Sequence, residues 1–224
     1  MSVSVSAAVA GRISVRAFLP KPVPRELVEE LLETARRAPS GGNVQPWRLH
    51  VLGGATLDEF RALIRARREA GAQEAPQYQV YPPHLWEPHR SYRFKNGEDL
   101  YASIGVVRED KPARLAQFAR NFAFFDAPVA LFFSLDRRFA LAQWADMGML
   151  MQTIMLLAVE RGLGTCPQAC WAAWPETVAE FLELDEGQIL LGGMALGYPD
   201  EAAPVNALRT DRAELADFCT IRGF

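Results

Sequence analysis

Two short segments of the chain combine residue types that suit binding of a phosphate-bearing ligand. In Gly11-Arg12-Ile13-Ser14-Val15-Arg16 the two arginines and the serine alternate, so in an extended segment their side chains lie on one side. Two guanidiniums that flank a hydroxyl suit a phosphate, or a phosphate at one end and a ring carbonyl at the other. Taken alone, the trio is also compatible with ordinary surface arginines.

The second segment is Pro39-Ser40-Gly41-Gly42-Asn43-Val44-Gln45-Pro46-Trp47, whose glycines can bring the backbone close to a ligand. The chain has none of the motifs G-x-S-x-G, H-E-x-x-H, G-x-x-x-x-G-K-[ST] or G-x-G-x-x-G. No catalytic side chain is therefore predicted, and a bound cofactor is the economical source of chemistry. Three histidines and three cysteines are too scattered for a metal site, and the spacing of Cys166 and Cys170 predicts reduced, buried thiols.

The composition is that of a globular protein without a strong electrostatic partner. Of 224 residues, 50% are hydrophobic and 23% charged, and the net charge of −3 argues against binding to nucleic acid. The longest uncharged stretch, Met147–Val159, is shorter than a membrane span, and the N-terminus does not resemble a signal peptide. We therefore expect no membrane association and a location in the cytoplasm.

Alternating helices and strands are predicted to position the two segments. A helix over 25–38 precedes the second segment, and the alternation of Trp47, Leu49 and Val51 predicts a strand that ends at Gly53-Gly54. Thr56 and Glu59 form a capping-box pattern for a helix that reaches about Ala70. The arginines of this helix are predicted to form a solvated face; they are Arg61, Arg65, Arg67 and Arg68.

The rest of the chain predicts an α+β domain that spans 1–224, with 71–120 as a lid or insert. That segment is rich in proline and aromatic residues and lacks clear periodicity, so its aromatics serve either ligand binding or packing between subunits. Further helices are expected over 138–161 and 175–184 and from Thr210 onward, the 138–161 helix ending in a left-handed cap at Gly162 or Gly164. Strands are expected over 129–135 and 188–196, with Gly192-Gly193 inside the second.

Taken together, R-x-S-x-R, P-S-x-x-N-x-Q-P-W, the long central helix, G-L-G-T-C-P-Q and Asn206-Ala207-Leu208-Arg209 resemble the nitroreductase family of FMN-dependent oxidoreductases. The resemblance covers nearly the whole chain. It implies a central mixed, mostly antiparallel sheet surrounded by helices, in an intertwined homodimer with two FMN sites at the subunit interface.

The resemblance also implies a role for each site residue. Arg12, Ser14 and Arg16 would bind the FMN phosphate and the pyrimidine side of the ring. Asn121 matches the ring-edge asparagine, and Arg209 the C-terminal phosphate-binding arginine, with Arg212 as a second candidate. Four residues would reach the flavin from the other subunit: Pro39, Ser40, Asn43 and Gln45.

One departure from the family pattern concerns the flavin N5 contact. Many members carry Pro-x-Glu-Gly where this chain has Pro167-Gln168-Ala169-Cys170. A backbone N–H can bond to N5 whatever the side chain, but the acidic group is missing here.

The activity implied is transfer of two electrons from NAD(P)H through FMN to nitroaromatic or quinone acceptors by a ping-pong mechanism. Arg90 or Arg93 would favour acidic acceptors such as nitrobenzoates. The alternative is a flavin-binding or flavin-remodelling protein without nitroreductase turnover.

Overall fold

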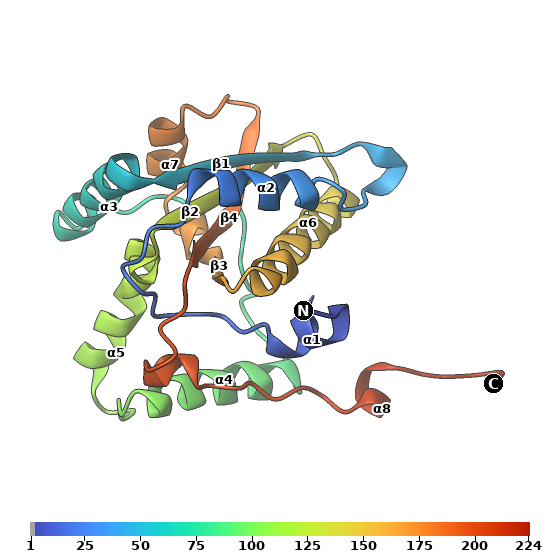
Figure 1. Ribbon diagram of the computed structural model, residues 1–224. Helices are drawn as coiled ribbons and strands as arrows, with labels where there is room; N and C mark the ends of the chain where they lie inside the picture. The colour runs from blue at the N-terminus through green and yellow to red at the C-terminus, as the bar shows by residue number, and fades with distance from the viewer. Residues whose placement is uncertain (1–2) are drawn as a thin grey trace.

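The computed structural model describes residues 3–224 and has a four-stranded sheet at its centre (Figure 1). The strands are β1 (Trp47–Gly53), β2 (Val129–Asp136), β3 (Gly164–Gln168) and β4 (Gln188–Gly197), in the order β1-β2-β4-β3. The strand pairs are antiparallel, and a parallel contact occurs where Ser14 bridges Thr165. The predicted α+β class with a mostly antiparallel sheet is confirmed.

Helices surround this sheet. The α-helices are α1 (Val5–Gly11), α2 (Arg25–Ala35), α3 (Gly54–Glu69), α4 (His89–Ser103), α5 (Lys111–Ala119), α6 (Leu141–Glu160), α7 (Pro175–Leu182) and α8 (Leu215–Phe218). Short 3₁₀ turns are η1 (Gly41–Asn43), η2 (Arg120–Asp126), η3 (Ala169–Ala173) and η4 (Pro204–Asn206). In the part of the chain from residue 3 to 224, no helix is long and apolar enough to cross a membrane.

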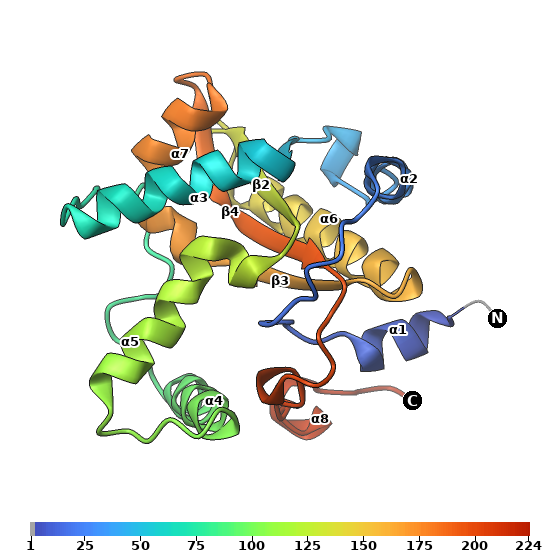
Figure 2. The ribbon, with the colours of Figure 1, turned by 60° about the vertical axis from the view of Figure 1, so that its left-hand side comes forward.

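Strand β2 separates two hydrophobic layers, because successive side chains of a strand point to opposite faces. Ala130 and Phe132 belong to the layer formed with α3, η2, η3 and α7. Leu131, Phe133 and Leu135 belong to the layer formed with α2 and α6. Figure 2 shows α3 and α7 on one side of the sheet and α2 and α6 on the other. A strand buried on both faces is a continuous apolar run, which is why its position was predictable from the sequence.

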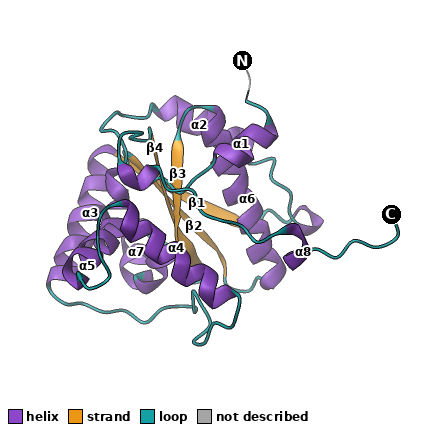
Figure 3. Ribbon diagram, turned by 90° about the horizontal axis from the view of Figure 1, so that it is seen from below, coloured by secondary structure: helices purple, strands orange, loops and turns teal. Residues whose placement is uncertain are grey.

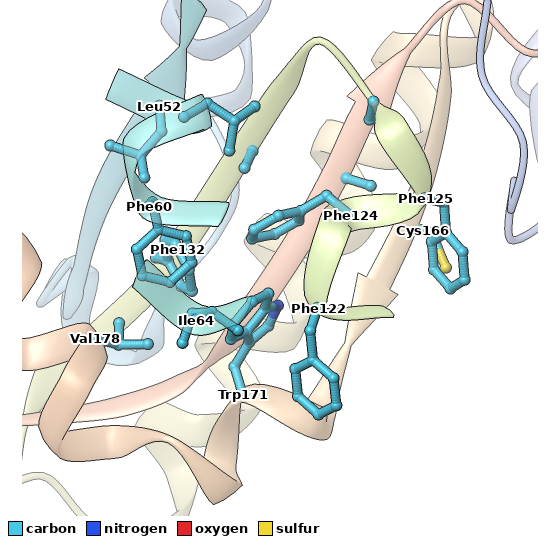
Figure 4. Packing of buried hydrophobic residues seen from close by; sticks show 14 of the residues in the cluster. Leu52, Phe60, Ile64, Phe122, Phe124, Phe125, Phe132, Cys166, Trp171 and Val178 are labelled. Atoms are coloured by element: carbon cyan, nitrogen blue, oxygen red, sulfur yellow. The ribbon is translucent and has the colours of Figure 1, made fainter. Parts of the chain in front are cut away.

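Trp171 is fully buried in the first layer and holds η3 against the sheet (Figure 4). Its ring stacks on Phe124 with the ring centroids 4.7 Å apart, and it meets Phe132 edge-on at 5.2 Å. Gly193 of β4 leaves room for the ring, because a Cβ at this position would lie 2.6 Å from Cδ1 of Trp171. The predicted strand glycines therefore serve packing, and they fix the backbone that precedes Trp171.

Helix α6 confirms the predicted central helix, although it begins at Leu141 and not at Arg138. Met147, Leu150 and Ile154 are buried on one side of it. On its outer side Leu141 is 86% exposed and Met149 38% exposed. Gly162 adopts a left-handed φ of 67°, the predicted C-terminal cap, whereas Gly164 begins β3. A helix that is apolar nearly all round thus buries only one side within its own chain.

The predicted start and solvated face of α3 are wrong. The helix begins at Gly54, whose φ of 53° lets the chain turn directly out of β1, and no side-chain cap closes it. Arg61 donates to the main-chain oxygens of Ala123 in η2 and of Ala127 just after it. Arg67 lies 3.9 Å from Glu74, and Arg68 covers the Phe122 ring. Of the four arginines, Arg65 is the exposed one. The others lie along apolar surface while their charged ends find partners.

Other elements were missed or overpredicted. The segment 71–120 contains α4 and α5, and the short α1 and β3 were not predicted. Strand β3 lies at an edge of the sheet, where Pro167 is tolerated although it hides the strand pattern. From Thr210 onward only Leu215–Phe218 is helical, and Figure 3 shows this terminal segment leading away from the body. Without a surface to pack on, so short a helix is not extended.

Candidate functional site

The segment from Arg12 to Arg16 is extended and runs beside β3. Ser14 bridges Thr165, and the Val15 N–H donates to the Thr165 carbonyl at 2.9 Å. The Val15 side chain is buried, whereas Arg12, Ser14 and Arg16 line one cavity on the other side. The trio thus shares one cavity, which Ile13 also lines, and the segment runs next to the strand that carries Pro167 and Gln168.

The cavity has a volume of about 440 Å³ and gathers four arginines: Arg12, Arg16, Arg209 and Arg212. Ser14 and Thr210 add hydroxyl groups, and no Asp or Glu lines the cavity. Within residues 3–224, none of these four guanidiniums has a carboxylate oxygen within 4.0 Å. Four like charges without an acidic partner repel one another, so the arrangement favours a bound polyanion such as a phosphate. These residues fit the phosphate of FMN.

Asn206 holds the two ends of the chain together at this cavity. Its Oδ1 accepts from the Arg16 N–H at 2.8 Å, and its Nδ2 donates to the carbonyls of Ala17 and Asp200, each at 2.8 Å. Its own carbonyl accepts from Nη1 of Arg209 at 2.9 Å. This buried side chain therefore sets the position of Arg209 relative to Arg16, a role that the sequence analysis did not assign.

The backbone expected to face the flavin N5 lies at the end of β3 and the start of η3. The Gln168 side chain is 3% exposed and donates through Nε2 to the main-chain oxygen of Asn121 at 2.7 Å. It points into the protein, and of residues 167–170 only Ala169 is exposed, while Pro167 and Cys170 are half-buried. The structure brings the predicted Asn121 next to this segment, where its own Nδ2 donates to the Phe118 carbonyl at 2.9 Å.

The two thiols near this backbone are poor nucleophiles. Burial raises the pKa of Cys166 to about 11 and that of Cys170 to about 12, and both cysteines are free, as predicted. Both thiols are therefore protonated at neutral pH and supply no thiolate for chemistry.

The loop from Pro39 to Gln45 is rigidly built. Asn43 and Gln45 adopt left-handed φ values of 56° and 47°, which cost backbone energy unless neighbours hold them. Ser40 Oγ accepts from the Gln45 N–H at 3.0 Å, and Gln45 Nε2 donates to the Asn43 carbonyl at 3.2 Å. Asp146 of α6, which the sequence analysis missed, accepts from the Gly41 N–H at 3.2 Å. The loop is thus tied to the core.

This loop does not reach the arginine cavity within one chain. Pro39, Ser40, Asn43 and Gln45 line a separate cavity of about 380 Å³ with Arg36 and Arg37. No residue lines both cavities. Asn121 and residues 167–170 line neither of these cavities. The predicted site residues therefore form three groups in the single chain: the arginine cavity, the loop, and the end of β3 with Asn121 beside it.

The beginning of the 71–120 segment is anchored to the core. Glu74 accepts from the N–H of Glu176 at 2.7 Å, and so caps the start of α7. Gln77 accepts from the Leu190 N–H at 3.1 Å, and the half-buried Tyr78 donates through its hydroxyl to the Leu191 carbonyl. After Tyr78 the chain is more open: Tyr81, Trp86 and several aromatics of α4 are about half exposed.

Comparison with known proteins bears on the whole chain. The model of the nitroreductase family matches residues 9–198. The chain belongs to the nitroreductase family. A 4-nitrobenzoate reductase of Pseudomonas putida is 40% identical over 219 residues, which is 97% of this chain and 95% of that protein. A chloronitrobenzene nitroreductase of Comamonas testosteroni is 38% identical and matches 93% of this chain and 92% of its own.

Solved structures of this family superpose closely on the chain. The FMN and NADPH-dependent nitroreductase NfnB from Sphigopyxis sp. strain HMH has a TM-score of 0.95 at 46% identity, covering 99% of this chain and 100% of its own. NfnB from Mycobacterium smegmatis, solved in complex with NADPH, has a TM-score of 0.91 at 29% identity and covers 97% of each chain. The nitroreductase fold implied by the sequence motifs is confirmed.

One residue that lines the arginine cavity lies where the sequence analysis expected no binding residue. Asn96 of α4 lines the arginine cavity, although α4 belongs to the segment predicted to be a lid. An isolated asparagine in a helix carries no motif, so no sequence signal pointed to it.

Proposed function

We propose that this chain binds FMN and transfers two electrons from NAD(P)H to nitroaromatic or quinone acceptors. The observation that carries the proposal is the cavity that is lined by four arginines and the hydroxyl of Ser14 and by no acidic side chain. It is supported by relatives of nearly the same length that are named for reduction of nitrobenzoate or chloronitrobenzene. FMN, when bound, supplies the centre that accepts and donates the hydride.

The residues of the chain bind and orient this group. Arg12 and Arg209 neutralise the phosphate, with Arg212 beside them, and Ser14 adds a hydroxyl donor. Arg16 would serve the ring, where a fixed positive charge would stabilise negative charge near the pyrimidine carbonyl. The backbone from Pro167 to Cys170 would bind the N5 edge of the flavin, and Asn121 would hold the ring edge.

The acceptor site favours a flat, acidic aromatic molecule. Arg90 is paired with Glu87 at 3.4 Å, whereas Arg93 has no carboxylate within 4.0 Å among residues 3–224 and lies over the Tyr81 ring at 4.4 Å. Arg93 is therefore the better candidate to meet the carboxylate of a nitrobenzoate. Alanine at Arg93 should lower kcat/KM for 4-nitrobenzoate about tenfold while changing that for neutral nitrobenzene little. An equal loss for both substrates would reject this role.

A second copy of the chain completes each site. The Pro39–Gln45 loop cannot reach the arginine cavity of its own chain, and the outer side of α6 and the terminal Phe218 and Phe224 leave apolar surface exposed. An intertwined homodimer would cover this surface and bring the loop to the partner's flavin. Light scattering should give twice the chain mass of 24.9 kDa at micromolar concentration. A mass of one chain with flavin bound would contradict the dimer.

The exposed part of the 71–120 segment serves as a lid over the flavin face. Because Tyr78 and the residues just before it are anchored, the lid begins after Tyr78. Shortening the chain within 79–88 should alter KM and kcat for the acceptor and leave FMN bound. Loss of flavin from a folded variant would assign this stretch to the cofactor site. The three free cysteines suit a reducing compartment such as the cytoplasm, which stays a prediction.

The cofactor is tested first. The purified protein should be yellow, and heat should release one FMN per chain, identified by chromatography against FMN and FAD standards. Arg12→Ala and Arg209→Ala should each weaken FMN binding about tenfold or more, whereas Arg65→Ala on the exposed face of α3 should not. FAD, or no flavin after reconstitution, would overturn the cofactor assignment.

Turnover is tested with a panel of acceptors followed at the NAD(P)H absorbance. Because one face of the flavin has room for one flat ligand at a time, initial-rate plots at several acceptor concentrations should be parallel. Intersecting lines would indicate a ternary complex. NAD(P)H oxidation that no acceptor accelerates, or breakdown of the flavin ring under oxygen, would favour the flavin-binding or flavin-remodelling alternative.

A further inference from the structure

Helix α4 borders the arginine cavity, whose other walls come from residues near the N-terminus and near the C-terminus. Asn96 lines the cavity together with Arg12, Arg16 and Arg209, and no other residue of 71–120 does so. Figures 1 and 2 both show α4 passing beside the segment that follows β4, and α4 packs next to η4. The helix assigned to the lid is therefore also a wall of the cofactor cavity.

An ion pair fixes this turn of α4 against the segment that bears two of the arginines. Lys95 Nζ lies 2.8 Å from Oδ2 of Asp211 and 2.5 Å from Oδ2 of Asp99, one turn further along α4. Asp211 stands between Thr210 and Arg212, and both of these line the cavity. The turn that carries Asn96 thus has a defined position relative to the guanidiniums, although exposed pairs of this kind add little stability alone.

The Asn96 carboxamide has unused hydrogen-bond donors at this position. Among residues 3–224 its side chain makes no hydrogen bond to another protein group, so both of its N–H donors are available. The arginine cavity beside it is lined by guanidiniums and hydroxyls and by no carboxylate, whereas a neighbouring cavity that Asn96 also lines carries Asp99, Asp211, Glu214 and Asp217. A neutral donor among cations is suited to the oxygen of an anion that the cations hold, because such a hydrogen bond is charge-assisted.

We propose that Asn96 donates a hydrogen bond to the phosphate of FMN, so that α4 is part of the cofactor site and the bound phosphate holds α4 in place. This inference rests on the proposed FMN-dependent function. It couples cofactor binding to the position of the helix that carries the exposed aromatics and Arg93. Because coupling is reciprocal, the factor by which bound FMN favours the docked position of α4 is also the factor by which docking of α4 strengthens FMN binding.

The test compares FMN with riboflavin, which lacks the phosphate, in fluorescence titrations of the apoprotein. Asn96→Ala should raise the Kd for FMN about five- to tenfold and leave the Kd for riboflavin unchanged. Asn96→Asp should raise the Kd for FMN further, because its carboxylate repels the phosphate and competes for the arginines. Arg65→Ala is the control and should change neither Kd.

Failure of the fold does not explain the expected loss, since alanine is a better helix former than asparagine. Trypsin cleavage after Lys95 gives a second measurement that does not need riboflavin. Saturating FMN should slow this cleavage in the parent protein and less so in Asn96→Ala. Equal loss for FMN and riboflavin, no loss for either, or the same protection in both proteins would overturn the role of Asn96. A parent protein that binds no FMN would instead reject the proposed function.

Discussion

Replacing Asp146 by alanine tests whether a buried carboxylate on α6 holds the Pro39–Gln45 loop in the form that binds flavin. Asp146 is 4% exposed, and its Oδ1 accepts from the Gly41 N–H at 3.2 Å. Its Oδ2 is buried and has no hydrogen-bond partner among residues 3–224. Burying a carboxylate beside Met147 and Leu150 is costly, and the hydrogen bond to the loop is the interaction that offsets part of this cost. We expect Asp146→Ala to fold and to bind FMN less tightly.

The magnitude follows from the hydrogen bond that is lost. A hydrogen bond to a charged acceptor contributes about 1.5–3 kcal/mol, and each 1.4 kcal/mol changes a Kd about tenfold. If the whole loss appears in cofactor binding, the Kd for FMN rises about 10- to 150-fold. Asp146→Asn keeps an acceptor for the Gly41 N–H without the charge, so its effect should be smaller, about three- to tenfold. The free energy of unfolding of the apoprotein should change little, because the variant also removes an unpaired buried oxygen.

Two measurements separate positioning from stability. Fluorescence titration of the apoprotein gives the Kd for FMN, and thermal unfolding of the same apoprotein gives Tm. Glu160→Ala, at the exposed end of the same helix, is the matched control and should change neither. An Asp146→Ala protein that binds FMN like its parent would refute the reasoning. So would a drop in apoprotein Tm that accounts for the whole loss of affinity.

Three further outcomes follow from buried contacts. Asn206→Ala should lower the free energy of unfolding by about 2–4 kcal/mol and weaken FMN binding, measured by denaturant titration and fluorescence, because three buried side-chain hydrogen bonds disappear. Gly193→Ala should cost about 1–3 kcal/mol or more by the same titration, since its Cβ would collide with Trp171, and Gly187→Ala is the control. Cys166 should make the fold sensitive to alkali. The thiol of the unfolded chain ionises from about pH 9, whereas the buried thiol of the folded chain keeps its proton to about pH 11. The free energy of unfolding should therefore fall by about 1.4 kcal/mol per pH unit between these two values. Unfolding titrations from pH 8 to 11 should show this slope diminished in Cys166→Ala.

The sequence predicted well those elements whose patterns have one explanation. The unbroken apolar run of β2 and the apolar length of α6 appear where expected, because burial on two faces or in a central helix requires such runs. Gly162 takes the predicted left-handed cap because glycine, which has no Cβ, adopts a positive φ at little cost. By contrast, β3 contains Pro167, and its pairing with the Arg12–Arg16 segment is a long-range contact that no local pattern encodes.

The candidate site was predictable in part for a similar physical reason. Alternating arginines and a serine in an extended segment must share a side, and the structure confirms it. That Arg209 joins them depends on the buried Asn206, whose side chain makes long-range hydrogen bonds to Arg16 and Ala17. The interior role of Gln168 and the contribution of Asn96 arise from tertiary packing. The prediction of a solvated arginine face on α3 was wrong because the sequence does not reveal that a carbonyl such as that of Ala123 lies beside Arg61.

The division of the site residues between two cavities has a genetic consequence in the proposed dimer. A chain defective at Arg12 and a chain defective at Asn43 would each form inactive dimers with themselves. In a mixed dimer, one site would receive both defects and the other would receive none, because each site takes Arg12 from one copy and Asn43 from the other. Two loss-of-function alleles in these two groups should therefore complement each other when expressed together, whereas two alleles within one group should not.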